Sequence, residues 1–314
     1  MARVAVIGAG AWGTALAIHA DRAGHDVVLW ARDPASIAAA RESPRLPGHA
    51  IPEAVALAGT LPERADAVLL AVPVRHLRAA LGIGLPVGPL VLCSKGLEGG
   101  RFPLELAADC RPGVPAAVLT GPNFAHEIAA GLPAASVVAS DDAGLRAALV
   151  GLLGTPAFRL YGGSDPIGAQ VGGAAKNVVA IAAGAASGAG FGENARAALV
   201  TRGLAEVGRL ALALGGRAET VAGLSGLGDL LLTCTGPASR NFQLGLALGQ
   251  GGDAATLLAG RTHAVEGVAA ASALLRRAAG VDLPVIATVA ALLDGAVGIE
   301  GAMGRLLSRP GRDE

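Results

Sequence analysis

Short apolar runs alternate with longer segments of helical periodicity through the first half of the chain. The runs that read as buried strands cover residues 4–7, 27–30, 67–72, 90–94, 116–120 and 136–139. Apolar runs of this length, separated by helical or loop segments, are typical of a parallel sheet that helices cover on both faces. The pattern predicts an α/β fold built on a doubly wound parallel sheet.

The second half of the chain has a different pattern. After residues 161–168 the strand signals stop, and the apolar positions follow the helical period over residues 170–186, 195–214, 242–248, 265–278 and 283–293. A chain of 314 residues is also longer than one ordinary core requires. We therefore predict an α/β domain over residues 1–163 and an all-α helical domain over residues 164–314.

The composition is typical of a folded protein and excludes some classes of binding partner. Apolar residues make up 52% and charged residues 16% of a chain with zero net charge, and Lys and Arg do not cluster. This balance excludes disorder and lacks the basic patch of a nucleic-acid binder, and Gly and Pro interrupt the Ala-rich segments too often for membrane insertion. The cysteines and histidines show no metal-binding spacing. We expect a cytoplasmic protein without a metal, whose partner can still carry a phosphate.

A glycine-rich turn joins the first strand to the first helix. Gly8, Gly10 and Gly13 give the spacing GxGxxG between an apolar run and a helical segment. The first glycine permits a tight turn, the second lets the backbone approach a pyrophosphate, and the third allows the helix to pack closely on the strand. Among 47 glycines the spacing alone can arise by chance, but the strand and helix around it favour a dinucleotide-binding (Rossmann) domain.

The residues after the second strand bear on the choice of cofactor. An acidic residue that would bind a ribose 2′-hydroxyl is expected there, and "LWARD" has Arg32 instead, followed by Asp33. Arginine suits a 2′-phosphate, which favours NADPH over NADH. Two alternatives remain open at this point: Arg32 stacks on adenine while Asp33 reaches the ribose, or Arg32 is a solvated surface residue.

Two lysines occupy positions that suit chemistry. Lys176 is the only charged residue between Pro166 and Gly192. Burial of an unpaired ammonium is costly and lowers its pKa toward the range used in proton transfer; the alternative is a helix-edge lysine whose amine reaches water. Lys95 directly follows an apolar strand, at the sheet edge where such folds bind ligands, although a solvated turn lysine fits too.

Two polar segments interrupt the helical half. Asp229 opens an apolar run after a glycine-rich turn, where capping of a helix is the simple explanation. Ser239, Arg240 and Asn241 place a hydroxyl, a guanidinium and an amide together before a helix, which is the composition of a small anion site. Capping by Ser239 or Asn241, with Arg240 on the surface, is the alternative.

Taken together, the motifs closely resemble the NAD(P)-dependent glycerol-3-phosphate dehydrogenases of the bacterial type. The resemblance covers nearly the whole chain and rests on "GAGAWGTALA", "SKGLE", "TGPNFAHEIAAGLP", "GGAAKNVVAIAAG", "GLSGLGDLLLTCT", "SRNFQLGLALGQG" and "VEG" in this order. It implies a Rossmann domain, a helical substrate-binding and catalytic domain, and reversible reduction of dihydroxyacetone phosphate to sn-glycerol 3-phosphate for phospholipid synthesis.

The resemblance also implies roles for individual residues. Lys176 matches the proton donor and acceptor of the family. The residues that match substrate contacts are Lys95, Gly121, Asn123, Lys176, Asp229, Ser239, Arg240 and Asn241. The residues that match cofactor contacts are Gly8, Gly10, Ala11, Trp12, Gly13, Arg32, Lys95, Ala125, Arg240, Ala264 and Glu266. Many relatives have threonine or serine where this chain has Asn123.

Two other functions fit parts of the sequence. A β-hydroxyacid dehydrogenase shares the two-domain plan and a lysine of the same type, but the segment from Asp229 to Asn241 belongs to the phosphate-substrate family. A nucleotide-binding sensor without catalysis would make the presence of Lys95, Lys176, Asp229 and Arg240 together a coincidence. The Ala- and Gly-rich helices suit close packing, and a homodimer is common in such folds.

Overall fold

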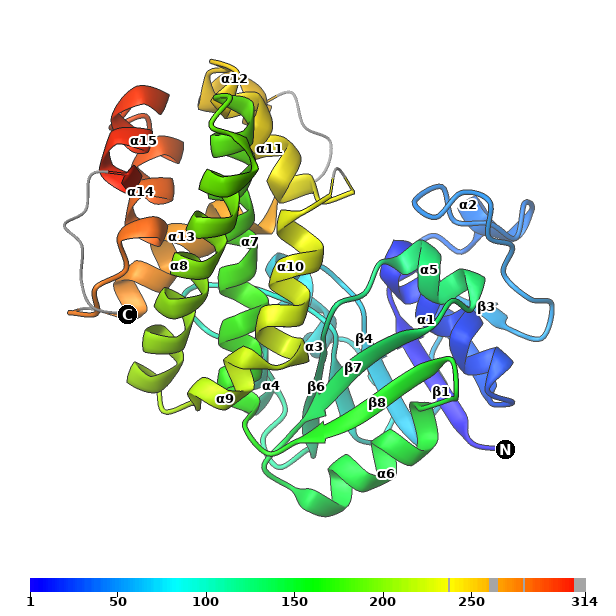
Figure 1. Ribbon diagram of the computed structural model, residues 1–314. Helices are drawn as coiled ribbons and strands as arrows, with labels where there is room; N and C mark the ends of the chain where they lie inside the picture. The colour runs from blue at the N-terminus through cyan, green and yellow to red at the C-terminus, as the bar shows by residue number, and fades with distance from the viewer. Residues whose placement is uncertain (237, 260–264, 279, 308–314) are drawn as a thin grey trace. The chain divides into compact units, whose positions relative to one another are not determined.

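A computed structural model of the chain describes residues 1–236, 238–259, 265–278 and 280–307. Contacts divide the chain into two compact units, Met1–Ala169 and Gln170–Glu314 (Figure 1). The division lies within helix α7 (Pro166–Gly188), whereas the sequence-based boundary follows strand β8 (Phe158–Gly163). One helix therefore begins in the first unit and continues into the second.

The first unit contains an eight-stranded sheet in the order β3-β2-β1-β4-β5-β6-β7-β8. Its other strands are β1 (Arg3–Ile7), β2 (Asp26–Trp30), β3 (Ala56–Ala58), β4 (Ala67–Leu70), β5 (Leu90–Leu92), β6 (Ala116–Thr120) and β7 (Ala134–Ala139). All neighbours are parallel except β6 and β7. The order reverses direction between β1 and β4, which is the arrangement that creates a ligand crevice at the carboxyl ends of the strands.

Helices cover both faces of this sheet, so the predicted doubly wound α/β class is confirmed. On one face Val4 and Val6 of β1 share a core with α1 (Ala11–Arg22), α5 (Ala125–Ala130) and α6 (Ala143–Leu153). On the other face lie α3 (Leu77–Gly82) and α4 (Pro103–Cys110), packed against the alternate residues of the same strands. The two short helices of this unit are α2 (Ala35–Ala38) and η1 (Val74–His76).

Three features of the sheet differ from the sequence-based prediction. Strand β3 has only three residues, too few to produce a pattern. Strand β8 was missed although its buried Phe158 and Leu160 alternate with exposed residues, as expected of an edge strand. One neighbouring pair departs from the predicted parallel arrangement, since β7 runs antiparallel to β6.

Basic side chains of α1 and the turn after it tie this helix to its neighbours. The His19 and His25 rings bond the carbonyls of Leu153 and Leu152, each at 2.7 Å, in the last turn of α6. Arg22 donates to two carbonyls in the last turn of α5. Cationic and N–H groups are favourable there because the last carbonyls of a helix lack partners within the helix. The nucleotide-turn helix is thus fixed at its far end.

The second unit consists of helices. Besides α7 these are α8 (Gly192–Ala213), α9 (Ala218–Ala222), the π-helical turn η2 (Leu224–Gly228), α10 (Asp229–Cys234), α11 (Arg240–Gly249), α12 (Ala254–Ala259), α13 (Glu266–Arg277), α14 (Pro284–Leu293) and α15 (Ile299–Leu307). The predicted all-helical second half is confirmed, with short helices added where the pattern was weak. Within the described residues no helix has the length and apolar character needed to span a membrane.

Glycines bring the backbones of α7 and α11 into direct contact. A methyl group added at Gly184 or Gly188 would lie 2.1 or 2.2 Å from a carbonyl oxygen of α11. One added at Gly245 or Gly249 would lie 2.0 or 2.2 Å from a carbonyl oxygen of α7. Neither helix can approach so closely with any larger residue at these positions. The backbones of the two helices that carry Lys176 and Arg240 are therefore in direct contact, with no side chain between them at these glycines.

This contact gives a stability prediction with an internal control. Gly245→Ala is expected to lower the free energy of unfolding by about 1–3 kcal/mol or more, because the new methyl group overlaps the Ile181 carbonyl. Gly208→Ala in α8 is the control, since no atom lies within 4 Å of its Cβ position. There the substitution should stabilise by about 0.5–1 kcal/mol. Denaturant unfolding of both variants tests this; equal stability would contradict the close contact.

Acid sensitivity of the first unit is expected to depend on His19. Burial is the largest influence on its pKa, which lies below the ordinary value of 6.5 despite the hydrogen bond to Leu153; Arg22 and His25 also lower it. A lowered folded-state pKa means that the unfolded chain takes up the proton first, so this contribution to stability is complete above about pH 6.5 and is lost as the pH falls below it. His19→Gln keeps an N–H donor and should flatten the dependence of unfolding free energy on pH between 7 and 5. His126→Gln, at a ring 57% exposed, should leave the slope as in wild type.

Candidate functional site

The glycine turn has the shape that a dinucleotide requires. Gly8 has φ +109°, and a side chain there would meet the Ala71 carbonyl at 2.9 Å. A methyl group at Gly13 would lie 1.8 Å from the Gly8 carbonyl oxygen, whereas the Cβ position of Gly10 has no atom within 4 Å. No side chain caps the N-terminus of α1. Open space beside uncapped helix N–H groups fits a pyrophosphate.

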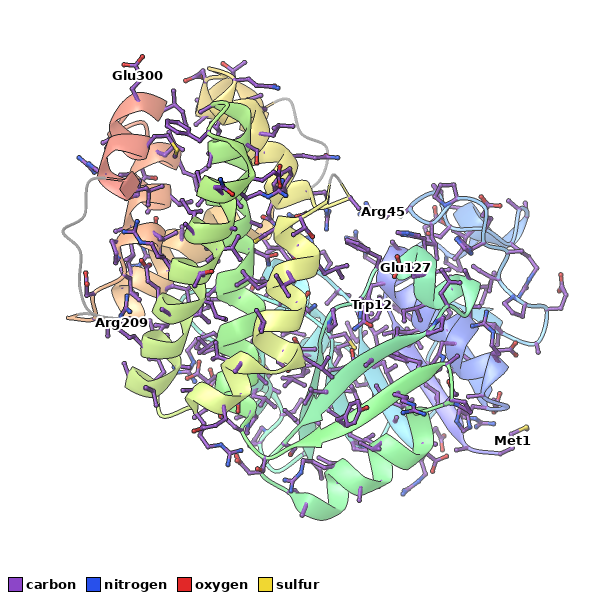
Figure 2. The ribbon with its side chains drawn as sticks, in the orientation of Figure 1. Met1, Trp12, Arg45, Glu127, Arg209 and Glu300 are labelled. Carbon is purple, nitrogen blue, oxygen red and sulfur yellow. The ribbon has the colours of Figure 1, made fainter. Side chains whose placement is uncertain are left out.

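A loop with three prolines is tied to this turn from the side. The hydroxyl of Ser43, which is fully buried, donates to the Ala9 carbonyl at 3.0 Å. Trp12 lies in the first turn of α1, partly buried against the core (Figure 2). Beyond β2, Arg32 is exposed, and Asp33 accepts from the backbone N–H of Ser36 at 3.3 Å. Asp33 is thus engaged in a local turn, while the guanidinium faces solvent.

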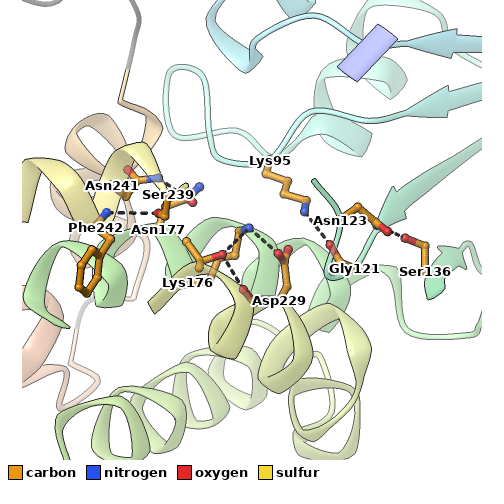
Figure 3. A network of polar contacts seen from close by, with 11 residues as sticks. Lys95, Gly121, Asn123, Ser136, Lys176, Asn177, Asp229, Ser239, Asn241 and Phe242 are labelled. Carbon is orange, nitrogen blue, oxygen red and sulfur yellow. Dashed lines mark hydrogen bonds and ion pairs between the residues drawn. The ribbon is translucent and has the colours of Figure 1, made fainter. Parts of the chain in front are cut away.

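A second group of polar residues lies at the carboxyl ends of β5 and β6. Lys95 donates from Nζ to the Gly121 carbonyl at 3.0 Å, and Asn123 bonds the hydroxyl of the fully buried Ser136 (Figure 3). Gly121 has φ +150°, and a side chain there would lie 2.8 Å from the Ser136 hydroxyl. The Oδ1 atom of Asn123 is enclosed without a partner among the described residues. An enclosed acceptor of this kind is satisfied by a ligand or water.

In the second unit Lys176 has a carboxylate partner from a distant part of the chain. Its Nζ lies 2.5 Å from Oδ1 of Asp229 and donates to the Thr233 hydroxyl at 2.9 Å. The Thr233 hydroxyl in turn donates to the Asp229 carbonyl at 2.6 Å. The Lys176 side chain is 11% exposed and that of Asp229 1%. Of the two alternatives for Lys176 the structure has the buried one, and the carboxylate that pairs with the amine comes from a part of the chain distant in sequence.

A π-helical turn places Asp229 against Lys176. Residues Leu224–Gly228 form this turn, and Asp229 is the first residue of α10, with Gly228 at the cap position. The capping explanation for Asp229 is therefore wrong. A side chain at Gly172 of α7 would lie 2.5 Å from the Ser225 carbonyl, so the turn lies directly on α7. π-Helical turns are rare and frequently occur at functional sites.

The Ser239–Asn241 segment opens α11 and serves two structural purposes. Ser239 caps the helix by accepting from the Phe242 N–H at 3.2 Å. Asn241 accepts from the Gly267 N–H at 3.1 Å and donates to Oδ1 of Asn177 at 2.9 Å. Arg240 is exposed. Capping by Ser239 is thus observed, and it leaves the Arg240 guanidinium available for an anion.

The two buried cysteines have raised thiol pKa values, and the metal-ligating side chains of the described residues do not cluster. Burial raises the pKa of the Cys93 thiol to about 12, against the smaller opposing effects of Lys95 and a hydrogen bond with Trp12. Burial likewise raises the pKa of Cys234 to about 12, although Lys176 lowers it. Both thiols are therefore protonated near neutral pH and poor nucleophiles. No group of three or more metal-ligating side chains occurs in the described part of the chain.

Most predicted site residues fall into three local groups. The first group is the glycine turn with the start of α1: Gly8, Gly10, Ala11, Trp12 and Gly13. The second lies at the ends of β5 and β6 and at the start of α5: Lys95, Gly121, Asn123 and Ala125. The third lies in the second unit, where Lys176 contacts Asp229 and the helix starts carry Arg240, Asn241 and Glu266. Ala264 lies outside the described residues.

Sequence reasoning missed Ser136, Asn177 and Thr233. Only Thr233 carried a usable signal, since it lies one helical turn after Asp229.

The two lysines of these groups are the only lysines in the sequence, all other residues in the Lys and Arg total of 25 being arginine. An arginine guanidinium is always charged in proteins and does not transfer protons, whereas a lysine amine can lose its proton. The chain thus has an amine only at Lys95 and Lys176, apart from its N-terminus. Both lie within the candidate site groups.

Comparison with protein families gives two matches that together span most of the chain. Residues 3–146 match the model described as the N-terminus of NAD-dependent glycerol-3-phosphate dehydrogenase, and residues 165–303 match the model of its C-terminus. The first match ends within α6 and the second begins one residue before α7, close to the division into compact units.

Individual relatives agree over the full length. A glycerol-3-phosphate dehydrogenase [NAD(P)+] of Acidiphilium cryptum is 56% identical, with 99% of this chain and 98% of the relative covered. One from Gluconobacter oxydans is 52% identical over 98% of this chain and 97% of the relative. The crystal structure of glycerol-3-phosphate dehydrogenase from Coxiella burnetii, 36% identical, superposes with a TM-score of 0.91, covering 98% of this chain and 99% of that one.

Proposed function

This chain belongs to the family of NAD-dependent glycerol-3-phosphate dehydrogenases, and from that premise we propose that Lys176 is its proton donor and acceptor in the reduction of dihydroxyacetone phosphate to sn-glycerol 3-phosphate. The chain is an oxidoreductase of the glycerol-3-phosphate dehydrogenase [NAD(P)+] type. The observation that carries the proposal is the buried contact of Lys176 with Asp229 and Thr233.

The chemistry explains why an amine is needed. NAD(P)H, when bound, supplies a hydride to the ketone carbon. The carbonyl oxygen then becomes an alkoxide, and the C=O π bond is replaced by a C–H bond. An ammonium beside that oxygen polarises the carbonyl and transfers its proton to the alkoxide, giving the alcohol and a neutral amine. In the reverse direction the neutral amine accepts the alcohol proton.

Asp229 and Thr233 prepare Lys176 for this role. The Asp229 carboxylate favours the charged ammonium before the reaction, and two fixed contacts limit the rotation of the flexible lysine stem. In the proposed reaction these contacts hold the amine in place while the ammonium donates a proton to the substrate oxygen.

The remaining site residues follow the family pattern. We assign the phosphate end of the substrate to the Ser239–Asn241 segment, where the exposed Arg240 guanidinium can bind two phosphate oxygens; the family pattern also assigns Arg240 to the cofactor. Lys95, Gly121 and Asn123 are the further substrate contacts. The cofactor contacts assigned are the glycine turn, Ala11, Trp12, Arg32, Lys95, Ala125, Ala264 and Glu266. We further propose a cytoplasmic homodimer that supplies glycerol phosphate for phospholipids.

We assign NADPH as the preferred cofactor because of the residues after β2. Arg32 is exposed, and Asp33 is engaged with the N–H of Ser36. A guanidinium binds a 2′-phosphate as a charged fork, whereas a ribose hydroxyl is usually read by a free carboxylate at this position.

Lys176→Arg is the sharpest test of the catalytic proposal. Arginine keeps the positive charge and the contact with Asp229 but cannot give up a proton. Turnover of dihydroxyacetone phosphate by Lys176→Arg and Lys176→Ala should fall by about two to four orders of magnitude, with NADPH affinity nearly unchanged. Steady-state assays and fluorescence titration of NADPH measure these quantities. High turnover in the arginine variant would reduce the role of Lys176 to electrostatics, and wild-type turnover only with 2-keto or β-keto acids would refute the substrate.

Arg32→Ser tests the cofactor proposal. Loss of one guanidinium contact to the 2′-phosphate should raise the KM for NADPH about 10-fold and leave the KM for NADH within about 2-fold. Arg159→Ser, at an exposed position on the edge strand β8, is the matched control and should change neither value. Equal effects of Arg32→Ser on both cofactors would mean that Arg32 contacts a part that they share.

A further inference from the structure

Residues 42–54, which include three prolines, form a loop (the proline loop) that one arginine closes at its base. Arg41 donates from Nε to the Ile51 carbonyl at 3.1 Å. Its Nη2 donates to the carbonyls of Pro52 and Val55 at 2.5 and 2.8 Å. The Ile51 N–H in turn donates to the Arg41 carbonyl at 2.7 Å. The two ends of the loop are therefore tied together by side-chain and backbone bonds.

The backbone at Arg41 shows that this closure is imposed by the fold. Its φ is +44°, the only positive φ of a non-glycine residue in the part of the chain that the structure describes. An L-residue adopts this conformation at a cost, and it persists where the surrounding contacts impose it. Here the contacts are the guanidinium bonds and the burial of Leu46 and Ile51 in the core of the first unit. The proline loop is thus a fixed part of the fold.

Ser43 connects the proline loop to the glycine turn. Its hydroxyl donates to the Ala9 carbonyl at 3.0 Å and accepts from the Arg45 N–H at 3.4 Å. Ser43 has no exposed surface, so solvent does not compete for this hydroxyl. A serine hydroxyl has one proton, and here that proton is committed to Ala9.

The Ala9 carbonyl belongs to the same planar peptide unit as the Gly10 N–H. In a trans peptide the two groups point in opposite directions, so a donor that holds the carbonyl also sets the direction of the N–H. Gly10 is the N-cap residue of α1, and no hydrogen bond among the described residues uses its N–H. Open space lies beside it, since no atom is within 4 Å of its Cβ position. The N–H that Ser43 orients is therefore available to an anion at the start of α1.

We propose that Ser43 is a positioning residue for the dinucleotide. Its hydroxyl holds the Ala9–Gly10 peptide so that the Gly10 N–H faces a pyrophosphate oxygen, and Arg41 acts through Ser43 by fixing the proline loop. A donor that is oriented before binding avoids the cost of ordering it on binding. The inference rests on the proposed assignment of the glycine turn to the cofactor. Because NADPH and NADH share the pyrophosphate, Ser43 serves both equally, in contrast to the role proposed for Arg32.

Ser43→Ala removes the hydroxyl and frees the peptide to rotate. The Kd values of NADPH and NADH, from fluorescence titration without substrate, should both rise about 3- to 10-fold and by the same factor. With saturating NADPH, kcat for dihydroxyacetone phosphate should stay within about 2-fold, because Ser43 contacts no reacting group in this proposal. The KM for either cofactor should follow its Kd.

Ser140→Ala is a closely matched control in the same unit. The Ser140 hydroxyl also donates to a backbone carbonyl at 3.0 Å, that of Ala116, and accepts from the N–H two residues later at 3.4 Å. Ala116 is the first residue of β6, so this bond lies at the amino end of the strands, opposite to the glycine turn. Loss of this hydroxyl should leave both Kd values as in wild type. A loss of stability common to the two variants is thereby separated from a loss of cofactor affinity.

Arg41→Lys tests whether the arginine acts through Ser43. Lysine lacks the planar fork that reaches several carbonyls, so amide hydrogen exchange of residues 42–54 in the cofactor-free protein should become faster. The Kd of NADPH should rise no more than in Ser43→Ala. In the Ser43→Ala background Arg41→Lys should change this Kd by no more than about 2-fold further. Additive losses would contradict action through Ser43.

The outcomes separate this inference from the assignment on which it rests. Gly10→Ala is measured first: its methyl group meets no protein atom, yet occupies the space assigned to the pyrophosphate, so cofactor binding should be lost. Wild-type affinity in that variant would refute the glycine turn as the cofactor site. If Gly10→Ala loses binding, unchanged Kd values in a folded Ser43→Ala protein, or a rise for NADPH alone, would overturn the role of Ser43. Should melting show that Ser43→Ala does not fold, Ser43→Cys, similar in size but a weaker donor, decides by the same criteria.

Discussion

The backbone contact between α7 and α11 is the constraint on which the second unit depends. Side chains normally keep packed helices 8–10 Å apart, and four glycines remove that spacing here. The contact places Asn177 within reach of Asn241 and gives α11 a fixed position along α7. The start of α11, which carries Arg240, is thereby set relative to the helix that carries Lys176. The glycines contain no reactive group, yet any larger residue at these positions would overlap a carbonyl of the facing helix and force the two helices apart.

The same close packing of small residues buries the Lys176 amine, and the ion pair with Asp229 compensates the buried charge. Helix α7 is buried along residues 168–186, so an amine on it loses most of its water. Removing one partner from a buried pair is far more costly than the pair is favourable, because it leaves an uncompensated charge. The π-helical turn before Asp229 therefore matters as much as the lysine, because it places the carboxylate that pairs with the buried amine. Thr233, one turn later on α10, accepts from the Lys176 amine and donates to the backbone carbonyl of Asp229, which links the amine to the start of α10.

The sequence allowed prediction of what local pattern determines, and little of what the fold brings together. Gly8, Gly10 and Gly13 could be found because a strand and a helix flank them. The pairing of Lys176 with Asp229 left no trace in spacing, since 53 positions separate them and a π-helical turn sets the angle. The antiparallel β7 was equally hidden, because an apolar run is the same in either direction. The caps that His19 and Arg22 place on α6 and α5 depend on tertiary packing alone.

The use of lysine in this chain connects these observations. Arginine serves at every other basic position, including the one assigned to the phosphate, where a fixed charge and a planar fork are the advantage. In the role proposed for Lys176 a fixed charge would be a defect, since that role requires the cation to become neutral and then recover its proton. Burial disfavours the charged amine and the adjacent Asp229 carboxylate favours it, so the two influences oppose each other. For the proton donor and acceptor proposed here, the amine must be able to exist in both forms, and an arginine at this position could not.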